Sequence, residues 1–215
     1  MTKIQKLLTS GLLLALTLLS TSCSKHDDDI KLSPIRGFYR IFRINAETPI
    51  NVNNFGENND LVSGYRYFFP NGRQDSRMLV YDINDPRFFM RVKPFNDDKG
   101  RYNAKNLIDF NIPIPEAGIK SGTPYIGEFK YGFNNYEYKL ASNGIDITIE
   151  KKDNNSDKQY GEIISVQQKS KNAIDVKAKL RLFDFTKKDY ITTLVTIEYV
   201  KVGDIWDDLY KEVNM

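Results

Sequence analysis

The second half of the chain alternates apolar and polar positions with the period of two that is typical of β-strands. Between residues 174 and 182 the even positions are apolar, and the odd positions are Asp175, Lys177, Lys179 and Arg181. The same alternation marks residues 123–133, 136–141, 145–149, 160–166 and 190–202, with turn residues between them. This spacing predicts an antiparallel meander of about five or six strands from residue 123 onward.

The first half predicts shorter strands between longer polar segments. The predicted strands are residues 37–44, 61–69, 77–83, 87–93 and 107–114. Residues 61–69 and 77–83 flank Pro70-Asn71-Gly72, which favours a hairpin turn because proline fixes φ and glycine accepts a positive φ. We expect residues 45–60 to form a loop, and the strand that begins at residue 107 to end at Pro113 and Pro115.

The last residues change from strand to helix periodicity. Asp204 can cap a helix, and Ile205, Leu209 and Val213 fall on one stripe. We therefore predict a short C-terminal helix that packs against the sheet or plugs one end of a barrel. Trp206 lies beside the stripe, where either core packing or stacking on a ligand would suit it.

These elements together predict an all-β fold, an antiparallel, barrel-like meander of about eight to ten strands. A two-sheet β-sandwich satisfies the same pattern and stays open as an alternative. Gly37-Phe38-Tyr39 opens the first strand with a glycine and two aromatic residues. This resembles the Gly-x-Trp of small lipocalin-type, calycin-like barrels, with phenylalanine and tyrosine but no tryptophan.

The first 22 residues have the layout of a secretory signal peptide. Lys3 and Lys6 precede an apolar run from residue 7 to residue 19, and small residues follow it. A membrane-spanning helix needs about 20 apolar residues, several more than this run contains. We therefore expect residues 1–22 to be removed from the mature chain.

The single cysteine, Cys23, lies directly after this segment. The run Leu18-Leu19-Ser20-Thr21-Ser22-Cys23 resembles a bacterial lipobox, with Ser20 where that family usually has leucine. The resemblance implies that Cys23 becomes the first mature residue and carries acyl chains on its sulfur and amino group. Two or more chains hold a protein stably at a bilayer, at about 0.8 kcal/mol per buried CH2. The alternative is an ordinary signal peptide with an incidental cysteine.

Three carboxylates, Asp27, Asp28 and Asp29, follow shortly after Cys23. This run resembles the acidic export signal of surface-exposed lipoproteins in some Gram-negative bacteria, and the alternative is a solvated spacer. The domain organisation we expect is a signal peptide at 1–22, a lipidated cysteine with a flexible tether at 23–34, and a single β domain at 35–215. The resemblance implies an outer-membrane, lipid-anchored and surface-exposed protein.

The net charge of the chain indicates which classes of partner it can bind. The formal charge of +3 includes Lys3 and Lys6, so the mature chain is near neutral. A near-neutral balance gives no electrostatic footprint for nucleic acid. The expected partner is therefore the membrane, reached through the acyl chains on Cys23, together with a ligand or protein outside the cell.

Residues that could carry chemistry are few. The single histidine, His26, lies in the tether, which excludes a histidine-based triad and a His-rich zinc site. A two-residue turn at Asn143-Gly144 would place Glu137 directly opposite Glu150. Such a carboxylate pair could bind a cation or act on a glycoside, although a solvated face with nearby lysines explains it equally. We expect no cofactor and no metal site.

Two weaker features complete the candidates. Residues 153–157 form an oxygen-rich loop that could bind calcium, but the loop lacks the ligand spacing of an EF-hand. Tyr65, Tyr67, Phe69 and Phe89 lie in predicted strands in which both parities carry aromatic residues. An exposed row of this kind could stack on sugars or bind a partner, and burial on both faces is the alternative.

The sequence favours a non-enzymatic, membrane-anchored surface lipoprotein that binds a glycan, a small apolar ligand or a protein partner. The absence of a histidine-based site and the lipobox-like segment are the reasons for this interpretation. The alternatives are a carboxylate-based hydrolase that uses Glu137 and Glu150, and a structural subunit of the cell envelope.

Overall fold

The computed structural model describes residues 33–65, 85–93, 106–150 and 157–204. The strands in this part are β1 (Gly37–Ile50), β2 (Asn58–Asp60), β3 (Met90–Val92), β4 (Leu107–Asp109), β5 (Ile112–Lys120), β6 (Thr123–Gly132), β7 (Tyr136–Leu140), β8 (Asp146–Ile149), β9 (Gly161–Ser170), β10 (Ala173–Asp184) and β11 (Asp189–Gly203). Short helices are α2 (Leu61–Tyr65), η1 (Pro86–Phe88) and η2 (Asp157–Gln159). The predicted C-terminal helix, with Trp206, lies outside the described residues.

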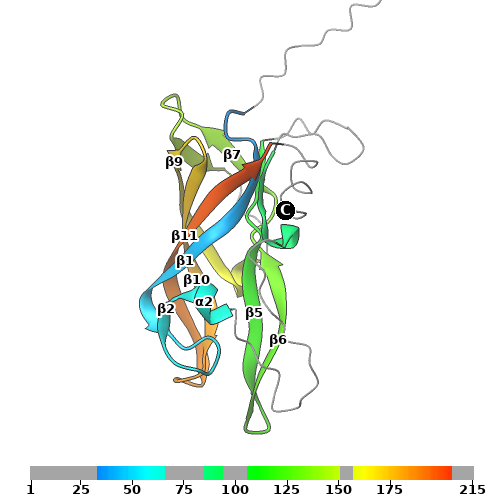
Figure 1. Ribbon diagram of the computed structural model, residues 1–215, viewed down its shortest axis with the longest axis vertical. Helices are drawn as coiled ribbons and strands as arrows, with labels where there is room; N and C mark the ends of the chain where they lie inside the picture. Colours follow the sequence, from blue (N-terminus) through cyan, green and yellow to red (C-terminus); the bar gives the residue numbers. More distant parts are fainter. Residues whose placement is uncertain (1–32, 66–84, 94–105, 151–156, 205–215) are drawn as a thin grey trace, which may run out of the picture. The chain divides into compact units, whose positions relative to one another are not determined.

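The strands close into an antiparallel barrel. Hydrogen-bonded neighbours run in the order β11-β10-β9-β8-β7-β4-β3-β1, and β1 also pairs with β11, which closes an eight-stranded ring. Figure 1 shows β1 and β11 side by side along the barrel wall. β2 adds to the edge of β1 outside this ring. The predicted all-β barrel is confirmed, and its closure rules out the alternative of a two-sheet β-sandwich.

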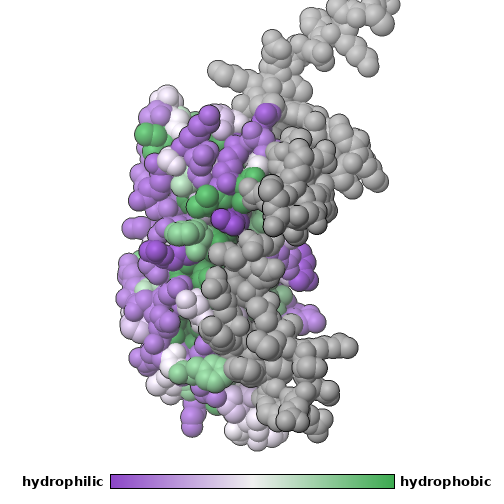
Figure 2. All heavy atoms as spheres, in the orientation of Figure 1, coloured by the Kyte–Doolittle hydropathy of each residue, from purple (hydrophilic) through white to green (hydrophobic). Residues whose placement is uncertain are grey.

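Buried apolar side chains line the interior of the barrel and form one large cluster. The predicted apolar face of β10 is confirmed, since Ile174, Val176, Ala178, Leu180 and Leu182 are all buried. Tyr199 and Phe110 are fully buried, and the Tyr199 hydroxyl donates a hydrogen bond of 2.9 Å to the Phe110 carbonyl oxygen. The outer surface is different, because hydrophilic residues cover much of the visible described face in Figure 2.

Two predictions for the first half were wrong. Residues 45–60 are not one loop, because β1 continues to Ile50 through pairing of its residues with β11 and β2. Leu61–Tyr65 is a helix, not the start of a strand. Asp60 stabilises the first turn of this helix, since its carboxylate accepts hydrogen bonds from the Val62 and Ser63 backbone N–H groups. Residues 66–84, which hold the rest of the predicted hairpin, lie outside the described part.

The prediction that Pro113 and Pro115 end a strand was also wrong. β5 runs through both prolines to Lys120, and they pair with Tyr131 and Phe129 of β6. Proline cannot donate to the ladder, so both prolines must occupy the non-hydrogen-bonded pairs, in which the backbone nitrogen faces away from the partner strand. Proline is compatible with β5 because β5 pairs with β6 alone.

A bend separates β4 and β7, which belong to the barrel, from β5 and β6, which form their own two-stranded sheet (Figure 1). Asn111, Phe133 and Asn135 adopt positive φ at this bend. Asp109 is buried there, accepts a 2.8 Å hydrogen bond from the Asn135 backbone and forms a 2.8 Å ion pair with Lys93. Asparagine adopts a positive φ readily, whereas Phe133 keeps one only where surrounding contacts over-determine it.

The middle of the β5–β6 hairpin packs against the barrel wall. Ala117 packs in one apolar cluster with Phe183 and Phe185, and the Tyr190 hydroxyl donates a 2.8 Å hydrogen bond to the Ala117 carbonyl oxygen. Phe183 shares the parity of Lys179 and Arg181, which are exposed, yet Phe183 is buried. The hairpin therefore covers the end of the outer face of β10, and a crevice lies between the two.

Candidate functional site

The crevice between the hairpin and the barrel wall has a volume of about 440 Å³, which is within the range of small-molecule sites. The hairpin strands β5 and β6 contribute Ile114, Pro115, Glu116 and Lys130. The segment before β9, together with β10 and β11, contributes Gln159, Tyr160, Arg181 and Tyr190. Two parts of the chain that are distant in sequence, residues 114–130 and residues 159–190, thus converge on one site.

Two glycines position Tyr160. Gly161 has a φ of +133°, and a Cβ there would lie 1.8 Å from the Lys179 carbonyl oxygen. Only glycine therefore lets the chain turn from Tyr160 into β9. The Tyr160 carbonyl oxygen then accepts a 2.8 Å hydrogen bond from the Arg181 backbone. On the other side, a Cβ at Gly132 of β6 would lie 3.3 Å from the Tyr160 ring. Tyr160 therefore fills the space between wall and hairpin beside the crevice.

Arg181 and Tyr190 form the charged aromatic part of the crevice. The Arg181 guanidinium carbon lies 4.5 Å from the centroid of the Tyr190 ring, in cation–π contact. Tyr190 also meets Phe183 edge to face, with ring centroids 5.3 Å apart. Its hydroxyl is held by the Ala117 carbonyl oxygen. The Tyr190 ring is thus held by Phe183 at its side and by Ala117 at its hydroxyl, and it provides a fixed surface against which Arg181 packs.

Glu116 and Lys130 lie on the hairpin side. Their charged atoms are 3.8 Å apart, and both side chains are about half exposed, so this ion pair is weak. Burial raises the pKa of Tyr190, Tyr125 and Glu116 add to the rise, and Arg181 opposes it. Tyr190 therefore remains a neutral hydrogen-bond donor at physiological pH.

This arrangement suits the binding of a polar, ring-shaped molecule. Tyr160 and Tyr190 offer aromatic surface, Arg181 and Lys130 donate hydrogen bonds, and Glu116 accepts them. Among the described residues that line the crevice, Glu116 is the single carboxylate, so paired-acid chemistry has no second member there.

The predicted carboxylate pair lies elsewhere. Its register is confirmed, because Tyr138 pairs with Ile149 and the Glu150 backbone N–H donates to the Glu137 carbonyl oxygen at 2.8 Å. The turn differs from the predicted two-residue type, since the Gly144 N–H donates to the Ala141 carbonyl oxygen and four residues form the loop. The register is the same as for a two-residue turn, because Leu140 still pairs with Ile147.

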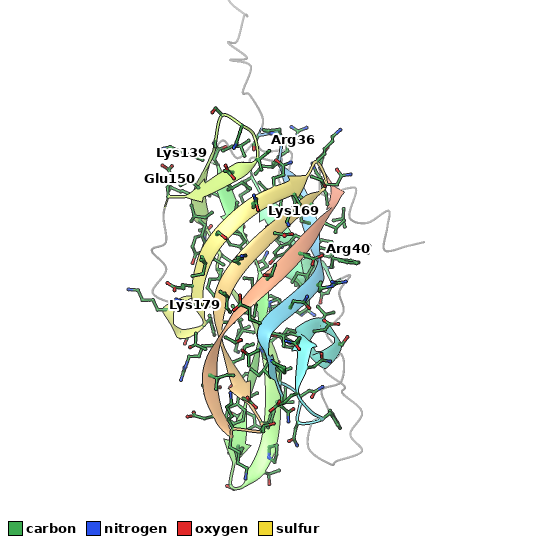
Figure 3. The ribbon with its side chains drawn as sticks, turned by 90° about the vertical axis from the view of Figure 1, so that its left-hand side faces the viewer. Arg36, Arg40, Lys139, Glu150, Lys169 and Lys179 are labelled. Atoms are coloured by element: carbon green, nitrogen blue, oxygen red, sulfur yellow. The ribbon has the colours of Figure 1, made fainter. Side chains whose placement is uncertain are left out.

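The side chains of this pair face solvent. Both Glu137 and Glu150 are exposed, and Lys139 forms an ion pair with Glu150. Figure 3 shows Lys139 and Glu150 together at the β7–β8 hairpin, away from Lys179 on β10. The lysine offsets the repulsion between opposed carboxylates, so the surroundings are those of a solvated surface.

Other sequence candidates divide into two groups. Tyr65 and Phe89 are buried, so burial, the alternative to an exposed aromatic row, is confirmed for these two residues. Tyr65 packs edge to face against Phe129, and Phe89 packs with Phe38. The remaining candidates, namely Tyr67, Phe69, Cys23, His26 and residues 153–156 of the oxygen-rich loop, lie outside the described residues.

Sequence reasoning missed the crevice. One signal for it exists on β10, where the outward positions run Asp175, Lys177, Lys179 and Arg181 and then change to Phe183. An aromatic residue at an outward position indicates that another element covers the strand there. The pattern does not say which element does so, and the hairpin that does lies about 60 residues earlier in the chain.

Comparison with family models, with curated proteins and with solved structures finds no match to this chain. In the part that the structure describes, no group of three or more histidine, cysteine, aspartate or glutamate side chains could hold a metal ion. The helices among the described residues are too short to cross a membrane.

Proposed function

We propose that this protein is a lipid-anchored surface protein that binds a saccharide in the crevice between the β5–β6 hairpin and the barrel wall. One observation carries this proposal: Tyr160, Tyr190, Arg181, Glu116 and Lys130 converge on a space of about 440 Å³. This volume suits one or two sugar rings.

The contacts favour a sugar over the other ligand classes. The charged side chains that line the crevice suit a polar ligand better than a small apolar one. The crevice combines aromatic rings with hydrogen-bonding groups of both signs, which match the apolar faces and hydroxyl edges of a sugar ring. A protein partner would require a broader surface than a crevice of this size.

A binding role fits the chemistry better than a catalytic one. The single histidine of the chain is His26, in the segment expected to be a tether. A glycosidase requires two carboxylates on either side of the scissile bond. Glu116 is the single carboxylate among the described lining residues, and Glu137 and Glu150 lie on an exposed strand pair.

The proposed location follows from the N-terminal resemblance. Acyl chains on Cys23 would anchor the protein in the outer membrane, and residues 24–34 would act as a tether. The acidic run after Cys23 supports exposure at the cell surface. The membrane is therefore a proposed partner through lipid alone, with no role for nucleic acid.

Saturation-transfer difference NMR with a panel of neutral and acidic monosaccharides tests the binding proposal on the full chain in detergent micelles. We expect transfer to at least one sugar, and Tyr160→Ala should weaken binding about tenfold through lost stacking. The matched control is Lys139→Ala, which removes an exposed side chain at the β7–β8 hairpin. Equal binding by all three proteins, or no binding by any, would contradict the proposal.

The anchor has its own test. Mass spectrometry of the mature N-terminus from cells fed labelled fatty acid should find acylated Cys23, and Cys23→Ala should move the protein from the membrane to the soluble fraction. Protease treatment of intact cells should degrade the wild-type protein. Recovery of an unmodified Cys23 would contradict the anchor and leave the saccharide proposal standing.

The two alternatives make different predictions. If the protein were a carboxylate-based hydrolase, Glu137→Gln and Glu150→Gln would each abolish turnover of a glycoside substrate. If it were a structural envelope subunit, its deletion would weaken the envelope while crevice variants would have no effect. The ion pair of Lys139 with Glu150 argues against the first alternative.

A further inference from the structure

We infer that the bound saccharide carries a carboxylate, and that Arg181 is the residue that recognises it. This inference rests on the proposed saccharide-binding function and names the class of sugar.

The guanidinium of Arg181 lies over the Tyr190 ring, with its central carbon 4.5 Å from the ring centroid. A guanidinium that packs on an aromatic ring through its face keeps its N–H edge available for a ligand. The five N–H donors of arginine lie in the plane of the guanidinium and match a carboxylate in a bidentate geometry. A supported guanidinium loses less side-chain entropy when it binds a carboxylate, so its affinity is higher.

Arg181 lacks an acidic partner among the described residues, as does Lys177 on the same face of β10, but only Arg181 lines the crevice. On the same outer surface, Lys179 pairs with Glu162 at 2.9 Å, and Lys169 pairs with Asp175 at 3.1 Å. Among the described residues, no carboxylate lies within ion-pair distance of Arg181. An arginine that lines a crevice, stacked and without its own carboxylate, is suited to receive one from a ligand.

Glu116 limits what that ligand can be. Its carboxylate is 3.8 Å from the Lys130 amine, beyond hydrogen-bond distance, so its oxygen atoms can accept from sugar hydroxyls. A negatively charged residue on the hairpin side also disfavours ligands with charge spread around the ring. The combination selects a sugar with one carboxylate directed to Arg181 and a hydroxyl edge directed to Glu116, as in a uronic or sialic acid.

Isothermal titration of the full chain in detergent micelles tests this inference with matched pairs of sugars. Glucuronic acid is compared with glucose, galacturonic acid with galactose, and N-acetylneuraminic acid with N-acetylmannosamine. We expect the wild-type protein to bind at least one acid about tenfold or more tightly than its neutral partner. Arg181→Gln should weaken acid binding about 10- to 100-fold and neutral-sugar binding by much less, so the preference for the acid over its neutral partner should be lost.

Two further variants separate recognition from folding. Arg181→Lys keeps the charge but loses the bidentate fork, so it should restore part of the preference for the acid. Lys177→Gln removes an exposed cation from the same face of β10, outside the crevice lining, and should bind like the wild type. Unfolding midpoints of all variants show whether a loss of binding reflects a loss of structure.

The outcomes distinguish this inference from the proposed function. Equal binding of acid and neutral sugars, with the same affinity in Arg181→Gln, would overturn the role of Arg181 and leave a saccharide site in place. Tighter binding of glucose 6-phosphate than of glucuronic acid would overturn the carboxylate and assign the arginine to phosphate. Failure of the wild type to bind any sugar would overturn the proposed function itself.

Discussion

The Tyr190 hydroxyl donates a 2.8 Å hydrogen bond to the Ala117 carbonyl oxygen, across 73 residues of sequence. This contact joins the beginning of β11 to the middle of β5, and so ties the β5–β6 hairpin to the barrel wall. The same Tyr190 ring supports Arg181. One side chain therefore holds the two sides of the crevice together and positions its principal cation.

Tyr190→Phe should loosen the hairpin without removing the ring. Loss of this hydrogen bond should lower the free energy of unfolding by about 0.5–1.5 kcal/mol and increase amide exchange in β5 and β6. Tyr39→Phe is the matched control, since its hydroxyl donates to the Ile35 carbonyl oxygen in the barrel. Faster exchange in β5 and β6 of Tyr39→Phe, and not of Tyr190→Phe, would contradict the role of Tyr190.

Gly161→Ala should destabilise the protein by more than about 2 kcal/mol, because the new Cβ meets the Lys179 backbone and the φ of +133° is unfavourable for alanine. Gly144→Ala is the control. Its φ is also positive, at +68°, but nothing lies within 4 Å of the added Cβ, so we expect a loss of about 1 kcal/mol. Denaturant unfolding measures both values, and equal losses would show that the contact at Gly161 relaxes easily.

Asp85 should contribute to acid sensitivity. Burial alone would raise the pKa of this carboxyl, but hydrogen bonds from the Arg87 side chain and backbone, together with the Arg87 charge, lower it below its ordinary value. Because the pKa is lower in the folded state, the ionised carboxylate stabilises the fold above the unfolded pKa. That stabilisation is lost as the pH falls through the folded pKa, below about pH 4.

The variants Asp85→Asn and Arg87→Gln test this pH dependence. Each should be less stable than the wild type at neutral pH and should lose less stability between neutral pH and pH 3. Unfolding free energies from denaturant titrations at several pH values provide the measurement. A variant curve parallel to that of the wild type would show that other carboxylates account for the acid sensitivity.

The ion pair of Lys93 with Asp109 should stabilise the bend between the barrel and the hairpin. Both side chains are largely buried, at 16% and 12% exposure. Asp109→Asn should therefore cost about 3 kcal/mol, because it leaves the lysine ammonium without its charged partner. The double variant Lys93→Met with Asp109→Asn should be more stable than Asp109→Asn alone, and additive losses in the double-mutant cycle would contradict direct coupling.

The barrel itself could be predicted from the sequence, because its signal is local. Alternation along residues 174–182 reports which side of β10 faces the core, and burial of the even positions confirms it. The opposition of Glu137 and Glu150 could be predicted from Asn143-Gly144 for the same reason, since a short connection determines the register of its two strands.

The crevice, in contrast, was decided by tertiary structure. Its position depends on the bend at Asn111, Phe133 and Asn135: asparagine accepts a positive φ readily, but Phe133 keeps one only because tertiary contacts hold it. The helix at Leu61–Tyr65 and the continuation of β5 through Pro113 were also decided by tertiary structure, against the local prediction. An alternating pattern shows that one face of a strand is covered, but only packing between distant segments determines what covers it.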